Sequence, residues 1–100
     1  MSSEMIKLKN KLEDVNIPFV AEYDDFYRLH IMYPNNWNNS CRCSVICHEY
    51  SYGFEEGLLE IMGLLTEEEK ESDDVVGWLT ADNVFERIQK DYKEFLKGLN

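Results

Sequence analysis

The sequence predicts a small α+β protein in which an N-terminal helix and a long C-terminal helix lie on one face of a three-stranded antiparallel meander. Two observations lead to this prediction. Apolar residues recur at helical spacing near both ends of the chain, and three segments between them alternate apolar with polar residues. A length of 100 residues allows one domain, residues 1–100, with a modest core.

The first helix is predicted over residues 3–15. The serines before Glu4 can cap its N-terminus, and an acid in the first turn suits the helix dipole. Its apolar stripe consists of Met5, Leu8, Leu12 and Val15. Asn16 and Pro18 should end the helix, because proline disfavours a helical conformation at the residue before it.

Three strands are predicted next, over residues 17–23, 27–33 and 41–49. The residues that should face the helices are Ile17, Phe19, Ala21, Tyr23, Tyr27, Leu29, Ile31, Tyr33, Cys41, Cys43, Val45 and Cys47. A shift of one residue moves all side chains of a strand to the other face, so the first hairpin needs a loop of odd length, residues 24–26. The second hairpin should then pair Tyr33 with Cys41.

The opposite face of the predicted sheet is open and mixed in character. It carries Val20, Glu22, Arg28, His30, Met32, Arg42, Ser44, Ile46 and His48. Glu22 should lie across from Arg28, a favourable cross-strand pair. The apolar residues on this face would allow a weak dimer or a contact with a partner.

The second half of the chain is predicted to be more irregular. A short helix or a packed loop is expected over residues 54–62, where two glycines weaken an otherwise helical apolar pattern. Residues 66–74 are acidic and contain no apolar residue, so they should be solvated and mobile. The long last helix should begin after Thr80, with an apolar stripe formed by Val84, Phe85, Ile88, Tyr92, Phe95, Leu96 and Leu99.

Cys41, Cys43, Cys47 and His48 resemble a zinc-binding set at first sight. On a strand that rises about 3.3 Å per residue, however, the first and last thiols lie roughly 20 Å apart, whereas zinc needs its ligands around one point. His48 would also point away from the thiols. The pattern therefore favours a strand with buried thiols, and neither a metal nor another cofactor is expected.

The formal net charge of −10 argues against direct binding to nucleic acid or to an anionic membrane. No apolar run is long enough to span a bilayer, and no secretory signal is recognisable, so a cytoplasmic protein with reduced thiols is expected. The sequence contains neither a glycine-rich phosphate loop nor a supported Ser-His-Asp set. A non-enzymatic protein is therefore predicted.

The acidic stretch of residues 55–74 contains nine acids and one lysine. It can be a solvated surface, or it can present carboxylates to a basic protein as a mimic of DNA phosphates. Trp37, in an asparagine-rich loop, can fold over the sheet or anchor a partner. The candidate binding residues are Trp37, Glu55, Glu56, Glu60, Glu67, Glu68, Glu69, Glu71, Asp73 and Asp74.

Residues 51–69, S-Y-G-F-E-E-G-L-L-E-I-M-G-L-L-T-E-E-E, and residues 74–88, D-V-V-G-W-L-T-A-D-N-V-F-E-R-I, resemble small uncharacterised acidic proteins encoded by phages and prophages of Gram-positive bacteria. That family has no assigned activity, so the resemblance implies no catalytic residue. It implies a bacterial cytoplasm and an accessory phage role, and small acidic phage proteins often inhibit host enzymes or defences.

The predicted function is therefore that of a phage accessory protein, a monomer or weak homodimer, that binds a basic surface of a host or phage protein. Two alternatives remain open. The protein can be an assembly protein that dimerises through the open sheet face, or a metal-binding protein that uses its cysteines.

Overall fold

The computed structural model of the protein describes residues 3–98, apart from the side chain of Trp37. In this range five strands form one antiparallel sheet in the order β1-β2-β3-β4-β5. Its strands are β1 (Val20–Tyr23), β2 (Leu29–Tyr33), β3 (Cys43–Ile46), β4 (Leu59–Met62) and β5 (Val75–Leu79). The helices are α1 (Ser3–Asp14), α2 (Glu67–Ser72) and α3 (Ala81–Lys97), with 3-10 turns η1 (Trp37–Asn39) and η2 (Phe54–Glu56).

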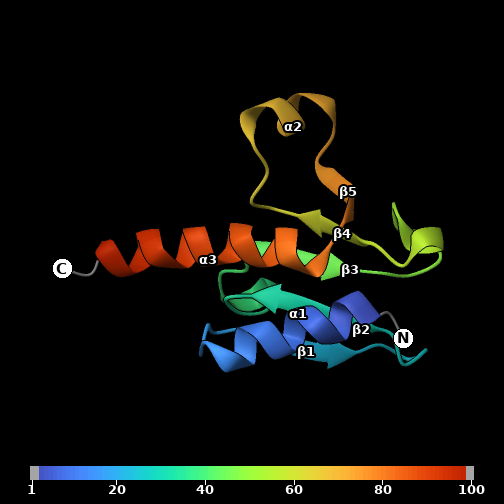
Figure 1. The fold of residues 1–100 in the computed structure, drawn as a ribbon, viewed down its shortest axis with the longest axis horizontal. Coiled ribbons are helices and arrows are strands. Elements are labelled where there is room, and N and C mark those ends of the chain that lie inside the picture. Colours follow the sequence, from blue (N-terminus) through green and yellow to red (C-terminus); the bar gives the residue numbers. More distant parts are fainter. Residues whose placement is uncertain (1–2, 99–100) are drawn as a thin grey trace.

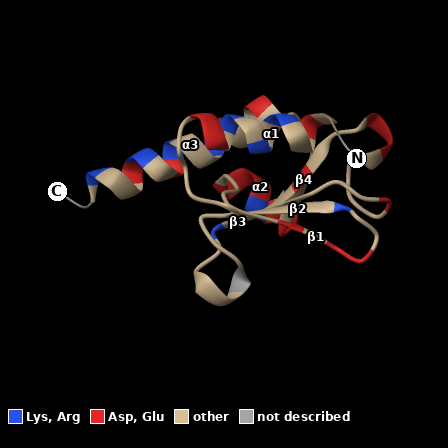
Figure 2. Ribbon diagram, turned by 90° about the horizontal axis from the view of Figure 1, so that it is seen from below, with Lys and Arg blue, Asp and Glu red and all other residues tan. Residues whose placement is uncertain are grey.

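Helices α1 and α3 lie side by side on one face of the sheet (Figures 1 and 2). The prediction of an α+β fold with two helices on one sheet face is confirmed. Thr80 caps α3 by accepting a hydrogen bond from the Asn83 backbone N–H. The Glu4 carboxylate also accepts a bond from the Ala81 backbone N–H at 2.7 Å, so a residue of α1 satisfies the first turn of α3.

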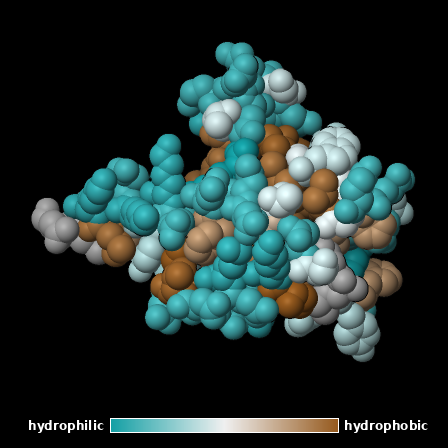
Figure 3. Space-filling model, viewed as in Figure 1, coloured by the Kyte–Doolittle hydropathy of each residue, from teal (hydrophilic) through white to brown (hydrophobic). Residues whose placement is uncertain are grey.

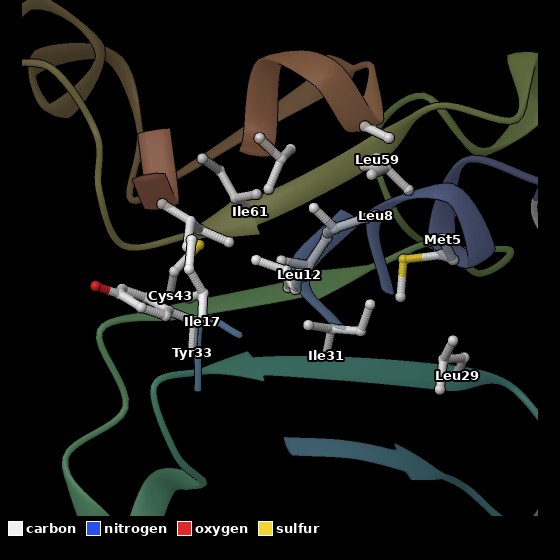
Figure 4. Packing of buried hydrophobic residues seen from close by; sticks show 14 residues of the cluster. Met5, Leu8, Leu12, Ile17, Leu29, Ile31, Tyr33, Cys43, Leu59 and Ile61 are labelled. Atoms are coloured by element: carbon white, nitrogen blue, oxygen red, sulfur yellow. The ribbon is translucent and has the colours of Figure 1, made fainter. Parts of the chain in front are cut away.

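The core lies between this helical layer and the sheet (Figure 4). Each element buries one apolar face: α1 contributes Met5, Leu8 and Leu12, and α3 contributes Ala81, Val84 and Ile88. The sheet adds Leu29, Ile31, Tyr33, Cys43, Val45, Leu59 and Ile61. The predicted faces of α1, of α3 as far as Tyr92, and of β2 and β3 are therefore correct. Helix α1 ends at Asp14 and leaves Val15 46% exposed. In the predicted stripe of α3, Phe95 and Leu96 are exposed instead of buried because they lie beyond the end of the sheet, and Leu99 lies outside the described residues.

The first two hairpins keep the predicted faces but not the predicted register. Ala21 pairs with Ile31, and Tyr33 pairs with Cys43 rather than with Cys41. In both hairpins the pairing is displaced by two residues because each connection is two residues longer than predicted. The first spans residues 24–28 and the second residues 34–42. Glu22 therefore lies opposite His30, not Arg28.

Tyr23 and Tyr27 were expected to face the core, and both expectations are wrong. Tyr23 is 53% exposed at the end of β1, and Tyr27 is 82% exposed in the loop with a φ of 60°. Cys41 likewise precedes β3 and is only half-buried. The longer loops remove these residues from the strands that were predicted to bury them.

The three-stranded meander and the helix at residues 54–62 are corrected by two further strands. Only Phe54–Glu56 forms a helical turn, and β4 follows with Leu59 and Ile61 buried and Glu60 between them on the other face. Gly57 and Gly63 both have positive φ and bracket the strand, as glycines do at the ends of extended segments. Residues 75–79, for which no strand was predicted, form edge strand β5.

Within the acidic run, residues 67–72 form the helix α2, which buries none of its residues. Thr66 and Glu69 make a reciprocal capping box, in which each side chain accepts a hydrogen bond from the backbone N–H of the other. We call residues 66–74 the acidic arm, because α2 projects from the sheet between β4 and β5 (Figure 1).

The sheet face opposite α1 and α3 is only partly open. Met32 and Ser44 are 2% and 7% exposed although they point away from the helices, and the chain around η1 lies on this side of the sheet (Figure 2). His30 contacts Ser44 through Nε2 and Oγ at 2.6 Å. Met62, further along the same face, remains 46% exposed.

Among the described residues, no helix combines the length and the apolar character needed to cross a membrane.

Candidate binding surface

Exposed aromatic side chains gather at the end of the molecule that is distant from the C-terminus of α3. They come from the β1–β2 loop, the β3–β4 connection and β5. Figure 3 shows pale and tan side chains gathered toward the right of this view. Their exposed fractions are Phe26 76%, Tyr27 82%, Tyr50 86%, Tyr52 46%, Phe54 41% and Trp78 58%. We call this surface the aromatic end. Six exposed aromatic rings at one end need an explanation, because isolated ones are normal but a cluster marks a contact surface.

The β1–β2 loop is held by its own polar groups. Asp24 Oδ1 accepts hydrogen bonds from the backbone N–H groups of Phe26 and Arg28, at 2.8 and 3.0 Å. The Arg28 guanidinium pairs with Asp24 at 2.6 Å and with Glu49 at 3.0 Å, and it lies 5.0 Å from the centre of the Phe26 ring. The loop is thereby tied to the β3–β4 connection.

The β3–β4 connection is also hydrogen-bonded internally. Ser51 is buried, accepts a hydrogen bond from the His48 backbone N–H and donates one to the His48 carbonyl. The Tyr52 backbone N–H donates to Glu60 Oε1 at 3.0 Å, which ties the connection to β4. The tyrosine rings of this segment therefore project from an ordered backbone.

Strand β5 contains a bulge at this end. Leu59 pairs with Leu79 and Ile61 with Val76, so β5 contains one extra residue between the two pairs. Within the bulge a Cβ atom on Gly77 would overlap the Cβ of Tyr52 and lie 2.6 Å from its carbonyl oxygen. Glycine is therefore required for the connection to approach β5 this closely.

Trp78 follows this glycine with a φ of 56°, which is rare for a bulky side chain. Its indole ring stacks on Tyr52, with centroids 5.5 Å apart and planes inclined by 8°. Tyr27, on the β1–β2 loop, has a similar positive φ. Two exposed aromatic residues are thus held in a disfavoured backbone conformation at the same end, and such outliers concentrate at functional sites.

Two neighbouring hollows open between these rings. The first, about 470 Å³, is lined by the β1–β2 loop, the β3–β4 connection and the start of α1. The second, about 270 Å³, lies between the β3–β4 connection, η2 and Trp78. Glu49 and Phe54 line both, so the hollows share a wall.

The negative charge of the protein is carried outside the two long helices. Helices α1 and α3 contain seven of the twenty acids and seven of the ten bases, and they are therefore neutral together. The loops of the aromatic end carry five acids, Asp24, Asp25, Glu49, Glu55 and Glu56, against the single base Arg28. Figure 2 shows the resulting contrast between mixed helices and acidic loops.

The structure divides the predicted acidic site into two parts, at opposite ends of β4. Glu55 and Glu56 belong to the aromatic end, and Glu60 supports it through Tyr52. The acids of the acidic arm lie beyond the other end of the strand: Glu67, Glu68, Glu69, Glu71, Asp73 and Asp74. The predicted anchor Trp37 has its side chain outside what the structure describes.

Glu69 is a structural residue of the arm rather than a free acid. Both of its carboxylate oxygens accept hydrogen bonds from Arg87 of α3, at 2.7 and 2.8 Å. These bonds lower the pKa of the Glu69 carboxyl to about 2. Arg87 also donates a hydrogen bond to the Leu64 carbonyl. One side chain therefore holds both α2 and the segment that leads from β4 into the arm.

The three thiols are free, with Cys43 buried and Cys41 and Cys47 half-buried. Burial raises the pKa of the Cys43 thiol to about 12 and also raises that of Cys41, so both are protonated at neutral pH. Over residues 3–98 no three side chains of histidine, cysteine, aspartate or glutamate converge as metal ligands would.

Tyr33, Arg42 and Asp91 form a further polar cluster, away from the aromatic end. The Tyr33 hydroxyl donates to Asp91 at 2.7 Å, and Arg42 forms a two-bond ion pair with the same carboxylate. A hollow of about 360 Å³ beside them is lined mainly by Pro18, Pro34, Tyr92 and Phe95. Because Arg42 already neutralises Asp91, no uncompensated charge faces this hollow.

A scan against protein-family models, a search of curated proteins and a search of solved structures each find no match to this chain. The similarity to phage proteins stays a prediction.

Sequence reasoning missed the aromatic end because its residues come from three separate segments. The alternating pattern assigns Tyr27 to a strand, and it does not connect Tyr50, Tyr52 and Trp78 with one another. One signal was present: aromatic residues directly follow the turn-forming residues Asp24 and Asp25 and surround Gly53. Rings in turns have no strand partner to pack against, so they are candidates for exposure.

Proposed function

We propose that the protein is a non-enzymatic binding module that recognises a basic surface of a partner protein through its aromatic end. The observation that carries this proposal is the cluster of six exposed rings, two of which belong to residues with positive φ. Tyrosine and tryptophan supply large contact areas with little loss of conformational freedom, and they dominate the energetics of many interfaces.

The charge of this end defines the kind of partner. Five acids and one arginine surround the rings, so a lysine- or arginine-rich surface is attracted and an acidic one is repelled. Electrostatic attraction raises the association rate, whereas burial of the rings on binding slows dissociation. A partner with a basic rim around an apolar centre fits both properties.

The acidic arm has a secondary role in this proposal. Helix α2 contains no apolar or aromatic residue, and Glu69 is occupied by Arg87, so the arm offers charge without an anchor. We assign it to steering of the basic partner and not to the contact itself. The phage-like stretch suggests a host protein as the partner, in which case binding would inhibit it.

The proposal is tested by removing the two most exposed rings of the aromatic end. Tyr27→Asn and Tyr50→Ser are combined, since asparagine tolerates the positive φ at residue 27 and both side chains are more than four-fifths exposed. The matched control is Phe95→Ser, which removes an exposed ring from the far end of α3.

Partners captured from a bacterial lysate by the wild type are identified, purified and measured by titration calorimetry. We expect the double variant to bind the basic partner at least about tenfold more weakly, while the Phe95 variant binds normally. Equal binding by all three proteins, or a partner without a basic surface, would refute the proposed function.

A second candidate function is self-association through the sheet face opposite α1 and α3. The observation in its favour is Met62, which is 46% exposed beside Val75 in the same cross-strand row. Met62→Lys should then shift a concentration-dependent dimer to a monomer in sedimentation velocity. A wild type that sediments as a monomer at millimolar concentration rejects this candidate.

A further inference from the structure

The first hollow of the aromatic end already contains a guanidinium group from the chain itself. Arg28 lies over the Phe26 ring at 5.0 Å and is paired with the carboxylates of Asp24 and Glu49. An aromatic face on one side and carboxylates around the edge are the two groups that bind guanidinium best. The contacts of Arg28 therefore show that aromatic rings and carboxylates of the aromatic end can bind an arginine side chain.

The second hollow is also lined by aromatic rings and carboxylates, but no basic side chain among the described residues lines it. It is lined by three carboxylates, Glu49, Glu55 and Glu56, and by three aromatic rings, Phe54, Tyr52 and Trp78. None of its lining residues is basic, and in the described part of the chain no ion pair reaches Glu55 or Glu56. The two hollows share Phe54 and Glu49, so they are adjacent positions on one surface.

Resting on the proposed function, we propose that the second hollow is the receptor for an arginine side chain of the basic partner. The guanidinium plane stacks on an aromatic ring of the Tyr52–Trp78 wall, and its N–H groups donate to the carboxylates of Glu55 and Glu56. Arginine is preferred to lysine because its planar group can stack and form two parallel hydrogen bonds at once.

The volume and the geometry of the hollow agree with a side chain rather than a larger ligand. About 270 Å³ is below the usual size of a site for a drug-sized molecule. The Tyr52–Trp78 stack and the glycine contact of β5 fix the wall before the ligand arrives. A preformed wall lowers the entropic cost of binding a flexible side chain.

The test is a nuclear magnetic resonance titration with the peptide acetyl-Gly-Arg-Gly-amide. Two comparison peptides contain lysine, or citrulline as the uncharged analogue of arginine. We expect shifts of amide signals at residues 49–57 and 76–79 and of the Trp78 indole signal. The arginine peptide should bind about three- to fivefold more tightly than the lysine peptide, and the citrulline peptide should cause no saturable shift.

Two double variants of equal net charge distinguish binding in this hollow from non-specific electrostatic attraction of the peptide to the protein. Glu55→Gln with Glu56→Gln should weaken binding of the arginine peptide about three- to fivefold, whereas Glu68→Gln with Glu71→Gln on α2 should not. Equal weakening by both pairs, equal shifts over the acidic arm, or saturable binding of the citrulline peptide would each overturn the inference.

The same variants distinguish this inference from the proposed function. Full binding of the partner protein by the Glu55 and Glu56 variant, together with loss in the Tyr27 and Tyr50 variant, leaves the proposed function standing and rejects the arginine receptor. Full binding of the partner by both variants rejects the proposed function itself, whatever the peptide does.

Discussion

The aromatic end and the acidic arm are both acidic and exposed, but they are built differently. The arm contains an isolated six-residue helix without an apolar side chain, and a single arginine connects it to α3. The aromatic end combines its acids with six rings, and backbone hydrogen bonds fix its three segments to one another. The net charge alone does not distinguish them.

This difference separates two contributions to binding. Exposed carboxylates act over distance and are screened by salt, so they affect how fast a partner arrives. Rings in a fixed arrangement bury apolar surface at contact, so they affect how long the partner stays. In this protein the two contributions come from different elements, and they can be altered separately.

The largest effects are expected at the glycines where the two regions join the sheet. Gly63 directly follows β4, on the segment that leads into the acidic arm. In Gly63→Ala the new Cβ atom would overlap the Arg42 carbonyl oxygen, and alanine would have to adopt a φ of 99°. We expect a loss of about 3 kcal/mol in the free energy of unfolding in urea. Gly77→Ala, at the aromatic end, should cost about 2 kcal/mol and also disturb the Trp78 fluorescence, because it displaces Tyr52.

Gly98→Ala is the control for both substitutions, since its new methyl group would meet no atom closer than 3.4 Å. Its stability should stay within about 0.5 kcal/mol of the wild type. A Gly77 variant as stable as this control would show that the close contact with Tyr52 does not hold the aromatic end together.

A smaller effect is expected for the connection between the arm and α3. Glu69→Gln should lower the free energy of unfolding by about 1–2 kcal/mol at pH 7, because two charge-assisted hydrogen bonds to Arg87 are lost. The Trp78 fluorescence should not change, since the aromatic end has its own supports.

The pH dependence follows from the lowered pKa of Glu69. A carboxyl that titrates near 2 in the folded protein and near 4.5 in the unfolded chain stabilises the fold above about pH 4.5. That contribution is lost as the pH falls from 4.5 towards 2, so the wild type and the Glu69 variant should converge over this window in thermal unfolding. Glu68→Gln, which removes an equal charge from the exposed side of α2, should show no such convergence.

The smallest change in stability is expected for an exposed ring. Tyr50→Ser should leave the free energy of unfolding within about 0.5 kcal/mol of the wild type, because the ring is 86% exposed. The dissociation rate of the basic partner should nevertheless rise severalfold in surface plasmon resonance. A Tyr50 variant that unfolds more easily would mean that this ring supports the fold rather than a contact.

The sequence predicted the elements whose pattern is local. The apolar residues of α1 and of α3 recur at helical spacing, and the alternation in β2 and β3 identified the residues that face the helices. It did not identify the register, because a shift of two residues preserves every face. The actual pairs are determined by the lengths of the two connections. The β1–β2 loop is held by the Asp24 hydrogen bonds, and the β2–β3 connection spans residues 34–42.

Strand β4 and the aromatic end were missed for different reasons. The apolar run of residues 58–65 satisfies helical and strand periods alike, and the flanking Gly57 and Gly63 were treated as weak points of a helix rather than as the ends of a strand. The aromatic end has only one local signal, the aromatic residues that lie next to turn-forming residues. That signal does not place Phe26, Tyr50 and Trp78 at one end of the molecule, which requires the order of all five strands.

The hydrogen bond between Glu4 and the first turn of α3 has a consequence for how the chain folds as it leaves the ribosome. Its two residues are 77 positions apart, whereas every strand of the sheet pairs with its neighbour in sequence. The hairpins can therefore form one after another during synthesis, because their contacts are local. Helix α1 emerges first but gains its partner only when residue 81 and those after it have left the exit tunnel. The helical layer closes last, and a nascent chain without α3 exposes the apolar side of its sheet to chaperones.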